Sequence, residues 1–106
     1  MKTFKWTEKQ KKALRGSIIK WKKIANGTGV DDGTRNCPCC KLWRNHKCVG
    51  CPIKEFTDVS RCDQTPYDVW YREGLYDTRE YNDYAKSLAI SFANFIRAVY
   101  LAGGGK

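Results

Sequence analysis

The chain has 106 residues, a length typical of one domain, and 42% of them are hydrophobic. This composition excludes a disordered chain, and the longest apolar stretch, about 15 residues between 88 and 102, is too short to span a membrane. The formal net charge is +9, and residues 1–23 hold nine Lys and Arg against one acid, which favours a polyanionic or acidic partner. No apolar run follows this basic start, so we expect no secretory signal and a cytoplasmic location.

The first predicted element is a basic helix within residues 7–26. Thr7 and Gln10 have the spacing of a capping box and Asn26 is typical of a C-cap, so we expect a helix from about residue 8 to 25. Apolar residues recur along it at steps of three and four, at Leu14, Ile18, Trp21 and Ala25. This stripe should face the core, with lysines on the opposite side at Lys9, Lys12, Lys20 and Lys23.

All six cysteines lie between residues 37 and 62, a segment with little regular periodicity. Two Cys-x-x-Cys pairs, Cys37/Cys40 and Cys48/Cys51, are separated by seven residues. Two thiolates three residues apart on a tight turn can both reach one ion at about 2.3 Å, so the two pairs predict a four-thiolate zinc site. In a reducing cytoplasm, clustered cysteines are more often metal ligands than disulfides.

Other ligand sets remain open. Adjacent Cys39 and Cys40 do not easily fit one tetrahedron, so we expect Cys39 to lie outside the site, whereas Cys62 is an alternative to Cys48. His46 is another alternative, in a Cys-x2-Cys-x5-His-x4-Cys spacing that loosely resembles the knuckle of retroviral nucleocapsid proteins. An iron–sulfur cluster would instead use Cys40, Cys48, Cys51 and Cys62, and disulfides are a third alternative. Because a four-thiolate zinc site is coordinatively closed, we expect no catalytic residue and no enzyme activity.

The C-terminal part, residues 65–102, is predicted to be helical. Thr65 followed by Pro66 is typical of a helix start, and Gly74 should end this short helix after about two turns. A second start signal at Asp77 predicts a long helix that runs to about Ala102, followed by a frayed glycine-rich tail. Its seam repeats every three or four residues, at Tyr81, Tyr84 or Ala85, Leu88, Phe92, Phe95, Val99 and Ala102.

These elements predict one mainly α-helical domain over residues 1–106. We expect two long helices packed antiparallel through their apolar stripes, plus a short helix. An irregular, zinc-stabilised cysteine knuckle should lie between the long helices and clamp their connection.

The cysteine segment and the helix start after it share one pattern, Cys37-x-x-Cys40, Cys48-x-Gly50-Cys51-Pro52-Ile53, Cys62 and Thr65-Pro66-Tyr67-x-x-Trp70. Over about residues 14–70, this pattern resembles a group of small uncharacterised proteins of phage and bacterial genomes. The resemblance implies that every cysteine except Cys39 belongs to the shared pattern. It implies no reaction, and it favours a phage-encoded protein acting in the host cytoplasm.

Two classes of partner fit the charge. The first is nucleic acid, because Lys and Arg contact phosphates and the knuckle adds Lys41, Arg44 and Lys47 to the lysines of the first helix. Trp43 lies among these bases and is expected to stack on an unpaired base. The alternative is a protein-interaction module or inhibitor that docks on an acidic host protein. Its anchors would be exposed apolar residues: Ile19, Trp43 or Phe56. Neither partner class involves a membrane or a small-molecule substrate.

Overall fold

Apolar residues at helical spacing bring the two ends of the chain together. The computed structural model describes residues 3–29, 31, 37–43, 49–58, 65–72 and 83–105. These residues form helices and no strand: α1 (Glu8–Ala25), α2 (Pro38–Trp43), α3 (Pro52–Thr57), α4 (Pro66–Arg72) and α5 (Asp83–Ala102). The mainly helical class expected from the sequence is therefore confirmed for this part of the chain. Within the same residues, no helix combines the length and the apolarity that crossing a membrane requires.

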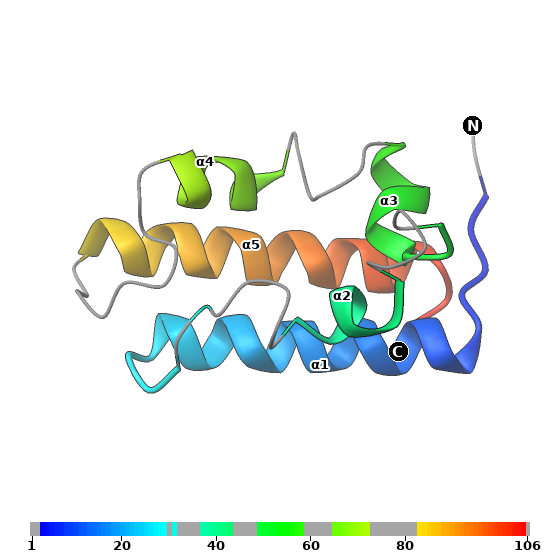
Figure 1. Cartoon of the computed structure of the whole chain (residues 1–106), viewed down its shortest axis with the longest axis horizontal. Coiled ribbons are helices and arrows are strands. Elements are labelled where there is room, and N and C mark those ends of the chain that lie inside the picture. Colours follow the sequence, from blue (N-terminus) through cyan, green and yellow to red (C-terminus); the bar gives the residue numbers. More distant parts are fainter. Residues whose placement is uncertain are drawn as a thin grey trace.

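The two long helices, α1 and α5, lie side by side and run in opposite directions (Figure 1). Helices α3 and α4 pack against α5, and α2 packs against α1. The expected antiparallel pairing is thus confirmed. The expected irregular knuckle is wrong in one respect, since residues 38–43 and 52–57 form helices. Each of these short helices begins at a proline, whose fixed φ suits the first helical position.

Local hydrogen bonds define both ends of α1 as the sequence predicts. The backbone N–H of Gln10 donates to Thr7 Oγ1 at 3.1 Å, and the N–H of Thr7 donates to Gln10 Oε1 at 2.8 Å, which completes the capping box. At the other end, the N–H of Asn26 donates to the Lys22 carbonyl at 3.0 Å. Gly27 follows with φ +79°, a left-handed conformation that glycine adopts without strain.

The buried stripe of α5 agrees with the predicted seam in part. Ala85, Phe92 and Val99 are buried as predicted, whereas Tyr84 and Ala102 are exposed and Leu88 and Phe95 are only partly buried. The other buried positions, which the predicted seam did not include, are Ala89, Ala93, Ile96 and Tyr100. Alanine carries little weight in a hydrophobic pattern, but its small side chain lets a neighbouring helix approach closely. Residues 77–82, which include the predicted start of the helix and Tyr81, lie outside the described residues.

An aromatic cluster around Trp21 joins α1, α4 and α5. The Trp21 ring centroid lies 5.1 Å from that of Trp70, 5.7 Å from that of Tyr67 and 4.9 Å from that of Phe92, each in an edge-to-face arrangement. Such pairs contribute about 0.5–1.5 kcal/mol each beyond the burial of their apolar surface. Trp21 is 2% exposed, so this cluster forms the centre of the core.

The segment before α1 is bound to the end of α5. Trp6 donates its indole Nε1–H to the Val99 carbonyl at 2.7 Å and its backbone N–H to the Gly103 carbonyl at 3.0 Å. A Cβ placed on Gly103 would lie 2.0 Å from the Trp6 ring, so no larger residue fits there. The expectation of a frayed tail is therefore wrong at Gly103, which is buried because the indole packs onto it.

Candidate metal centre and basic surface

Two cysteines occupy the same local position at the starts of α2 and α3. Cys37 precedes Pro38 and α2, and Cys51 precedes Pro52 and is the N-cap of α3. The Sγ of Cys37 accepts the backbone N–H of Cys40 at 3.4 Å. A sulfur at this position meets unpaired N–H groups of the first helical turn, which favour its negatively charged form.

The pKa of the Cys37 thiol is lowered from 9.0 to about 6. The largest cause is a hydrogen bond from the Cys40 thiol, and the backbone N–H of Cys40 and the positive charge of Lys20 act in the same direction. Burial opposes them, because it penalises the charged form. Cys37 and Cys40 therefore form a thiol pair in which Cys37 is poised to act as a thiolate ligand at neutral pH.

Cys39 and Cys51 form a second thiol pair. A hydrogen bond between the two thiols raises the pKa of Cys39 and lowers the pKa of Cys51, so Cys39 is the donor. Cys39 is 2% exposed, and its Sγ lies 3.7 Å from Ser17 Oγ of α1. The sequence gives no hint of this pairing, which brings Cys39 directly against one of the predicted ligands.

The described residues supply part of the predicted ligand set. Cys37, Cys40 and Cys51 are described, whereas Cys48 and the alternatives Cys62 and His46 lie outside the described residues. Among the described residues, no three His, Cys, Asp or Glu side chains converge in a way that would hold a metal ion. The chemistry of the donors nevertheless suits zinc, since the pKa values of Cys37 and Cys51 are both lowered and zinc is bound by thiolates.

Trp43, which belongs to the cysteine segment, is buried and does not lie on the surface. Its ring is 8% exposed and packs on Gly50, where a Cβ would lie 2.7 Å from the indole Nε1. Gln10 of α1 donates its Nε2–H to the Gly50 carbonyl at 2.9 Å, and the ammonium of Lys9 lies 5.7 Å from the Trp43 ring centroid. The expectation that Trp43 stacks on an unpaired base is therefore wrong for this conformation, because the ring is already covered.

Lys20 is part of the internal structure and is not a free surface cation. Its Nζ lies 2.9 Å from Oδ1 of Asp31, and its side chain is 10% exposed. The buried Asp31 carboxylate also accepts the indole Nε1–H of Trp70 at 3.1 Å. Lys20 thus holds residue 31 and α4 against α1, which corrects its predicted place among the phosphate-binding lysines.

The other predicted basic residues keep exposed positions where they are described. Lys9, Lys12, Lys23 and Lys41 are all exposed, and Arg44 and Lys47 lie outside the described residues. Of the predicted apolar anchors, Ile19 is 54% exposed. Phe56 is partly buried, with its ring 5.3 Å from that of Phe4 and 6.1 Å from that of Phe95.

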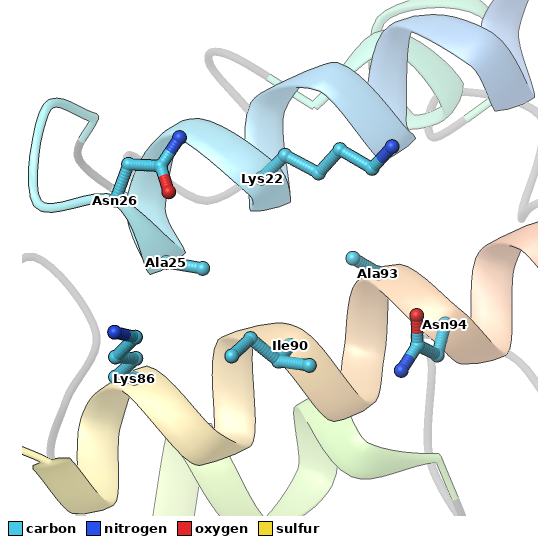
Figure 2. Close-up of a pocket in the computed structure, with 7 residues that line it drawn as sticks. All are labelled: Lys22, Ala25, Asn26, Lys86, Ile90, Ala93 and Asn94. Atoms are coloured by element: carbon cyan, nitrogen blue, oxygen red, sulfur yellow. The ribbon is translucent and has the colours of Figure 1, made fainter.

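A second group of basic residues, absent from the sequence prediction, lies along the junction of α1 and α5. Lys22 and Lys86 line an open groove of about 220 Å³ between the two helices (Figure 2). The rest of its lining is uncharged: Ala25, Asn26, Ile90, Ala93 and Asn94. Ala25 and Ala93 point into the gap between the helices and form its floor.

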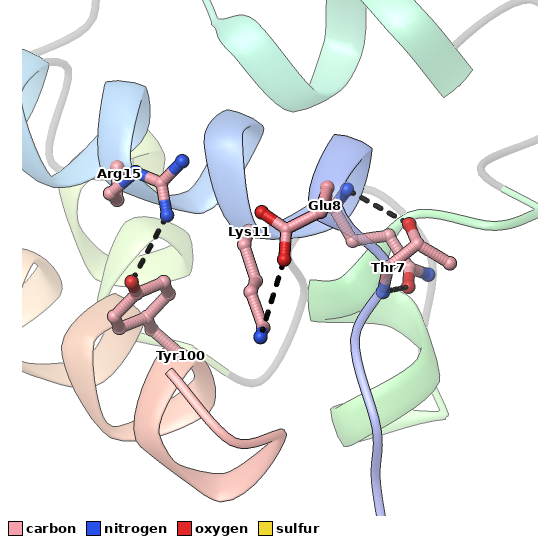
Figure 3. A network of polar contacts seen from close by, with 6 residues as sticks. Thr7, Glu8, Lys11, Arg15 and Tyr100 are labelled. Carbon is pink, nitrogen blue, oxygen red and sulfur yellow. Dashed lines mark hydrogen bonds and ion pairs between the residues drawn. The ribbon is translucent and has the colours of Figure 1, made fainter. Parts of the chain in front are cut away.

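The same junction carries further bases toward the other end of α1. Arg15 donates an Nη1–H to the Tyr100 hydroxyl of α5 at 3.1 Å, and Lys11 Nζ lies 3.7 Å from Glu8 Oε1 (Figure 3). Lys11, Arg15 and Lys22 follow one another at steps of four and seven residues, which places them on one edge of the helix. That spacing is the sequence signal that identifies this edge.

Comparison of the chain with protein-family models, curated proteins and solved structures finds no match.

Proposed function

We propose that the chain is a non-catalytic, basic protein that binds nucleic acid and whose cysteine segment is held by a structural zinc ion. The observation that carries the proposal is the set of exposed cations on a helical scaffold, among them Lys22 of α1 and Lys86 of α5. These side chains make no ion pair with any described residue, so they are available to phosphates. A phage-encoded protein acting in the host cytoplasm is part of the proposal, and it rests on the sequence resemblance alone.

The zinc ion would be held by Cys37, Cys40, Cys48 and Cys51, with Cys62 or His46 as alternatives. The lowered pKa values of Cys37 and Cys51 support this assignment, since zinc binds the thiolate and not the thiol. Bound zinc would stabilise the fold of the central segment, because the free energy of binding a structural metal adds to that of folding. A four-thiolate ion offers no open position to a substrate, which is the basis for the non-catalytic assignment.

Metal analysis of purified variants tests the zinc proposal. We expect about one zinc per wild-type chain and loss of that metal in Cys37→Ser and Cys51→Ser. Cys39→Ser is the matched control, since it removes a neighbouring thiol that the proposed ligand set does not use. Equal loss of zinc from Cys39→Ser would contradict the ligand set, and a brown protein that absorbs near 400 nm would replace zinc with an iron–sulfur cluster.

A titration of labelled nucleic acid at several salt concentrations tests the binding proposal. The logarithm of the association constant should fall linearly with the logarithm of the salt concentration, with a slope set by the number of phosphates contacted. No binding to single-stranded or duplex probes at low salt would exclude nucleic acid as the partner.

The alternative function is a protein-interaction module that docks on an acidic host protein. Ile19 favours it, because this side chain is 54% exposed among polar residues of α1, and protein interfaces combine buried apolar anchors with a polar rim. Ile19→Ser distinguishes the two functions, because it removes the apolar side chain without changing the charge. It should leave salt-dependent nucleic-acid binding nearly unchanged, whereas it should abolish stoichiometric capture of a protein partner.

A further inference from the structure

Cations from both long helices line one face of the α1–α5 pair. On α1 they are Lys11, Arg15 and Lys22, and on α5 they are Lys86 and Arg97. The groove residues Ile90, Ala93 and Asn94 lie between the two α5 cations in the sequence, and Arg97 is one helical turn beyond Asn94. The bases therefore flank a single path between the helices, on the edge that the contacts of Arg15 with Tyr100 also mark.

The middle of this path carries no neutralising acid among the described residues. Lys22, Lys86 and Arg97 are exposed and form no ion pair there. Glu8 is engaged with Lys11 at one end of α1, and Asp83 is the first residue of α5 at the other end of the path. An anion seated between these two ends would meet positive charge from both helices.

The shape of the path suits an extended chain of anions. Lys11 and Lys22 are eleven residues apart, as are Lys86 and Arg97, so each row of bases extends about 16 Å at about 1.5 Å per residue. A row of this length can meet several consecutive phosphates of one nucleic-acid strand. The carboxamides of Asn26 and Asn94 in the groove add uncharged donors, which commonly contact phosphate oxygens (Figure 2).

We propose that this α1–α5 groove, bordered by Lys11, Arg15, Lys22, Lys86 and Arg97, holds the phosphate backbone of a nucleic acid. The inference rests on the proposed function and specifies which surface contacts the nucleic acid. That surface lies on the edge of α1 opposite the buried Trp43 ring. The lining of the groove between Lys22 and Lys86 contains no aromatic side chain on which a base could stack, and Tyr100, beside Arg15, is only 7% exposed. Binding through this face is therefore independent of base sequence.

Two triple variants with equal charge loss test the inference. The groove variant is Lys22→Gln, Lys86→Gln and Arg97→Gln. The rival variant is Lys12→Gln, Lys23→Gln and Lys41→Gln, which removes three exposed cations predicted from the sequence. Fluorescence anisotropy of a labelled 20-nucleotide DNA and of its duplex gives the association constant over a range of KCl concentrations. Far-UV circular dichroism and the thermal midpoint confirm that each variant is folded.

We expect the groove variant to bind at least about tenfold more weakly at low salt, and its log–log salt slope to shrink by about two to three. The rival variant should change the slope by less than about one. Equal losses in both variants would overturn the groove as the path while the proposed function stands. Absence of any wild-type binding would remove the proposed function itself. If the groove variant loses affinity for polyglutamate by the same factor as for DNA, the groove is a site for any polyanion. That result would overturn the assignment to phosphate.

Discussion

At Cys37 the thiol meets four groups that stabilise its charge and one influence that opposes it. The Cys40 thiol, the backbone N–H groups of Cys40 and Cys39 and the Lys20 ammonium lower its pKa, and burial raises it. The four groups prevail because hydrogen bonds to a charged sulfur act at short range, where burial also strengthens them. The pKa is lower in the folded state, so this contribution to stability is full above pH 9 and is lost as the pH falls through about 6.

Alkylation of the reduced, metal-free protein checks this pKa. The reaction of Cys37 with iodoacetamide should reach half of its maximal rate near pH 6, since only the thiolate is nucleophilic. Cys39 should remain unreactive over the same range, because burial and its bond to Cys51 raise its pKa. Mass spectrometry of the labelled peptides measures both rates in one sample. A Cys37 midpoint between pH 8 and 9 would contradict the described environment.

The contacts of Asp31 with Lys20 and Trp70 lead to a second prediction about a single residue. Asp31→Asn preserves size and an acceptor for Trp70 Nε1–H, but it leaves the Lys20 ammonium without its counter-charge. We expect a loss of about 1–3 kcal/mol in the free energy of unfolding, measured by urea denaturation. Asp68→Asn is the matched control, because its ion pair with Arg72 is 3.5 Å long and largely exposed, and it should cost less than about 0.5 kcal/mol. Similar losses in both variants would refute the role of Asp31 as a buried anchor.

On the scale of elements, the small residues of α5 decide how α1 packs against it. Ala89 is fully buried and Ala85 is 1% exposed, and α1 and α5 share the most extensive contact in the molecule. The bulkier Phe95 faces α3, where it meets the ring of Phe56, and Phe92 lies between α1 and α4, against the rings of Trp21 and Tyr67. Helix α5 is thus divided into a stripe of small residues packed closely on α1 and an aromatic side that begins at Phe92.

Enlarging one alanine of α5 tests this division. Ala89→Leu should destabilise the protein by about 1–3 kcal/mol, because extra methylenes in a filled core force the helices apart. The control is Ala98→Leu, the same change at an exposed position of the same helix, which should stay within about 0.5 kcal/mol. Chemical denaturation of both variants provides the comparison. If Ala89→Leu is neutral, the seam predicted from the larger residues describes the packing better than the alanine stripe.

The elements also show which features a sequence can predict. The bounds of α1 and the start of α4 were predictable because capping depends on neighbours three residues away, such as Thr7 with Gln10. Part of the α5 stripe was misassigned, because the chosen repeat passed through Leu88 and Phe95 and not through their buried neighbours Ala89 and Ile96. The Asp31 anchor and the Cys39–Cys51 pair were not predictable, since each joins residues at least 11 positions apart through contacts that only the fold creates.

On the scale of the whole molecule, two sets of contacts support different parts of the chain. The α1–α5 pair is joined by apolar packing and by the Trp6 contacts with Val99 and Gly103. Helix α2 rests on α1 where Pro38 meets Gly16, a contact in which an added Cβ would lie 3.0 Å from the proline. The cysteine segment therefore lies on this scaffold. Cys51 is buried in the same continuous core, but the aromatic cluster around Trp21 is formed without a cysteine.

Chelation of the proposed zinc ion should separate these two parts. Apolar burial around Trp21 does not depend on metal, so α1 and α5 should keep their protection against hydrogen exchange after zinc is removed. Residues 38–43 and 52–57 should lose part of their protection while they remain folded for most of the time, because short helices of six residues open more often when no metal supports them. Hydrogen-exchange mass spectrometry with and without a chelator resolves the segments, with Cys39→Ser as a variant that should respond as the wild type does. Loss of protection in all helices would show that the metal is essential to the entire fold. Unchanged exchange in both short helices would show that no structural metal supports them.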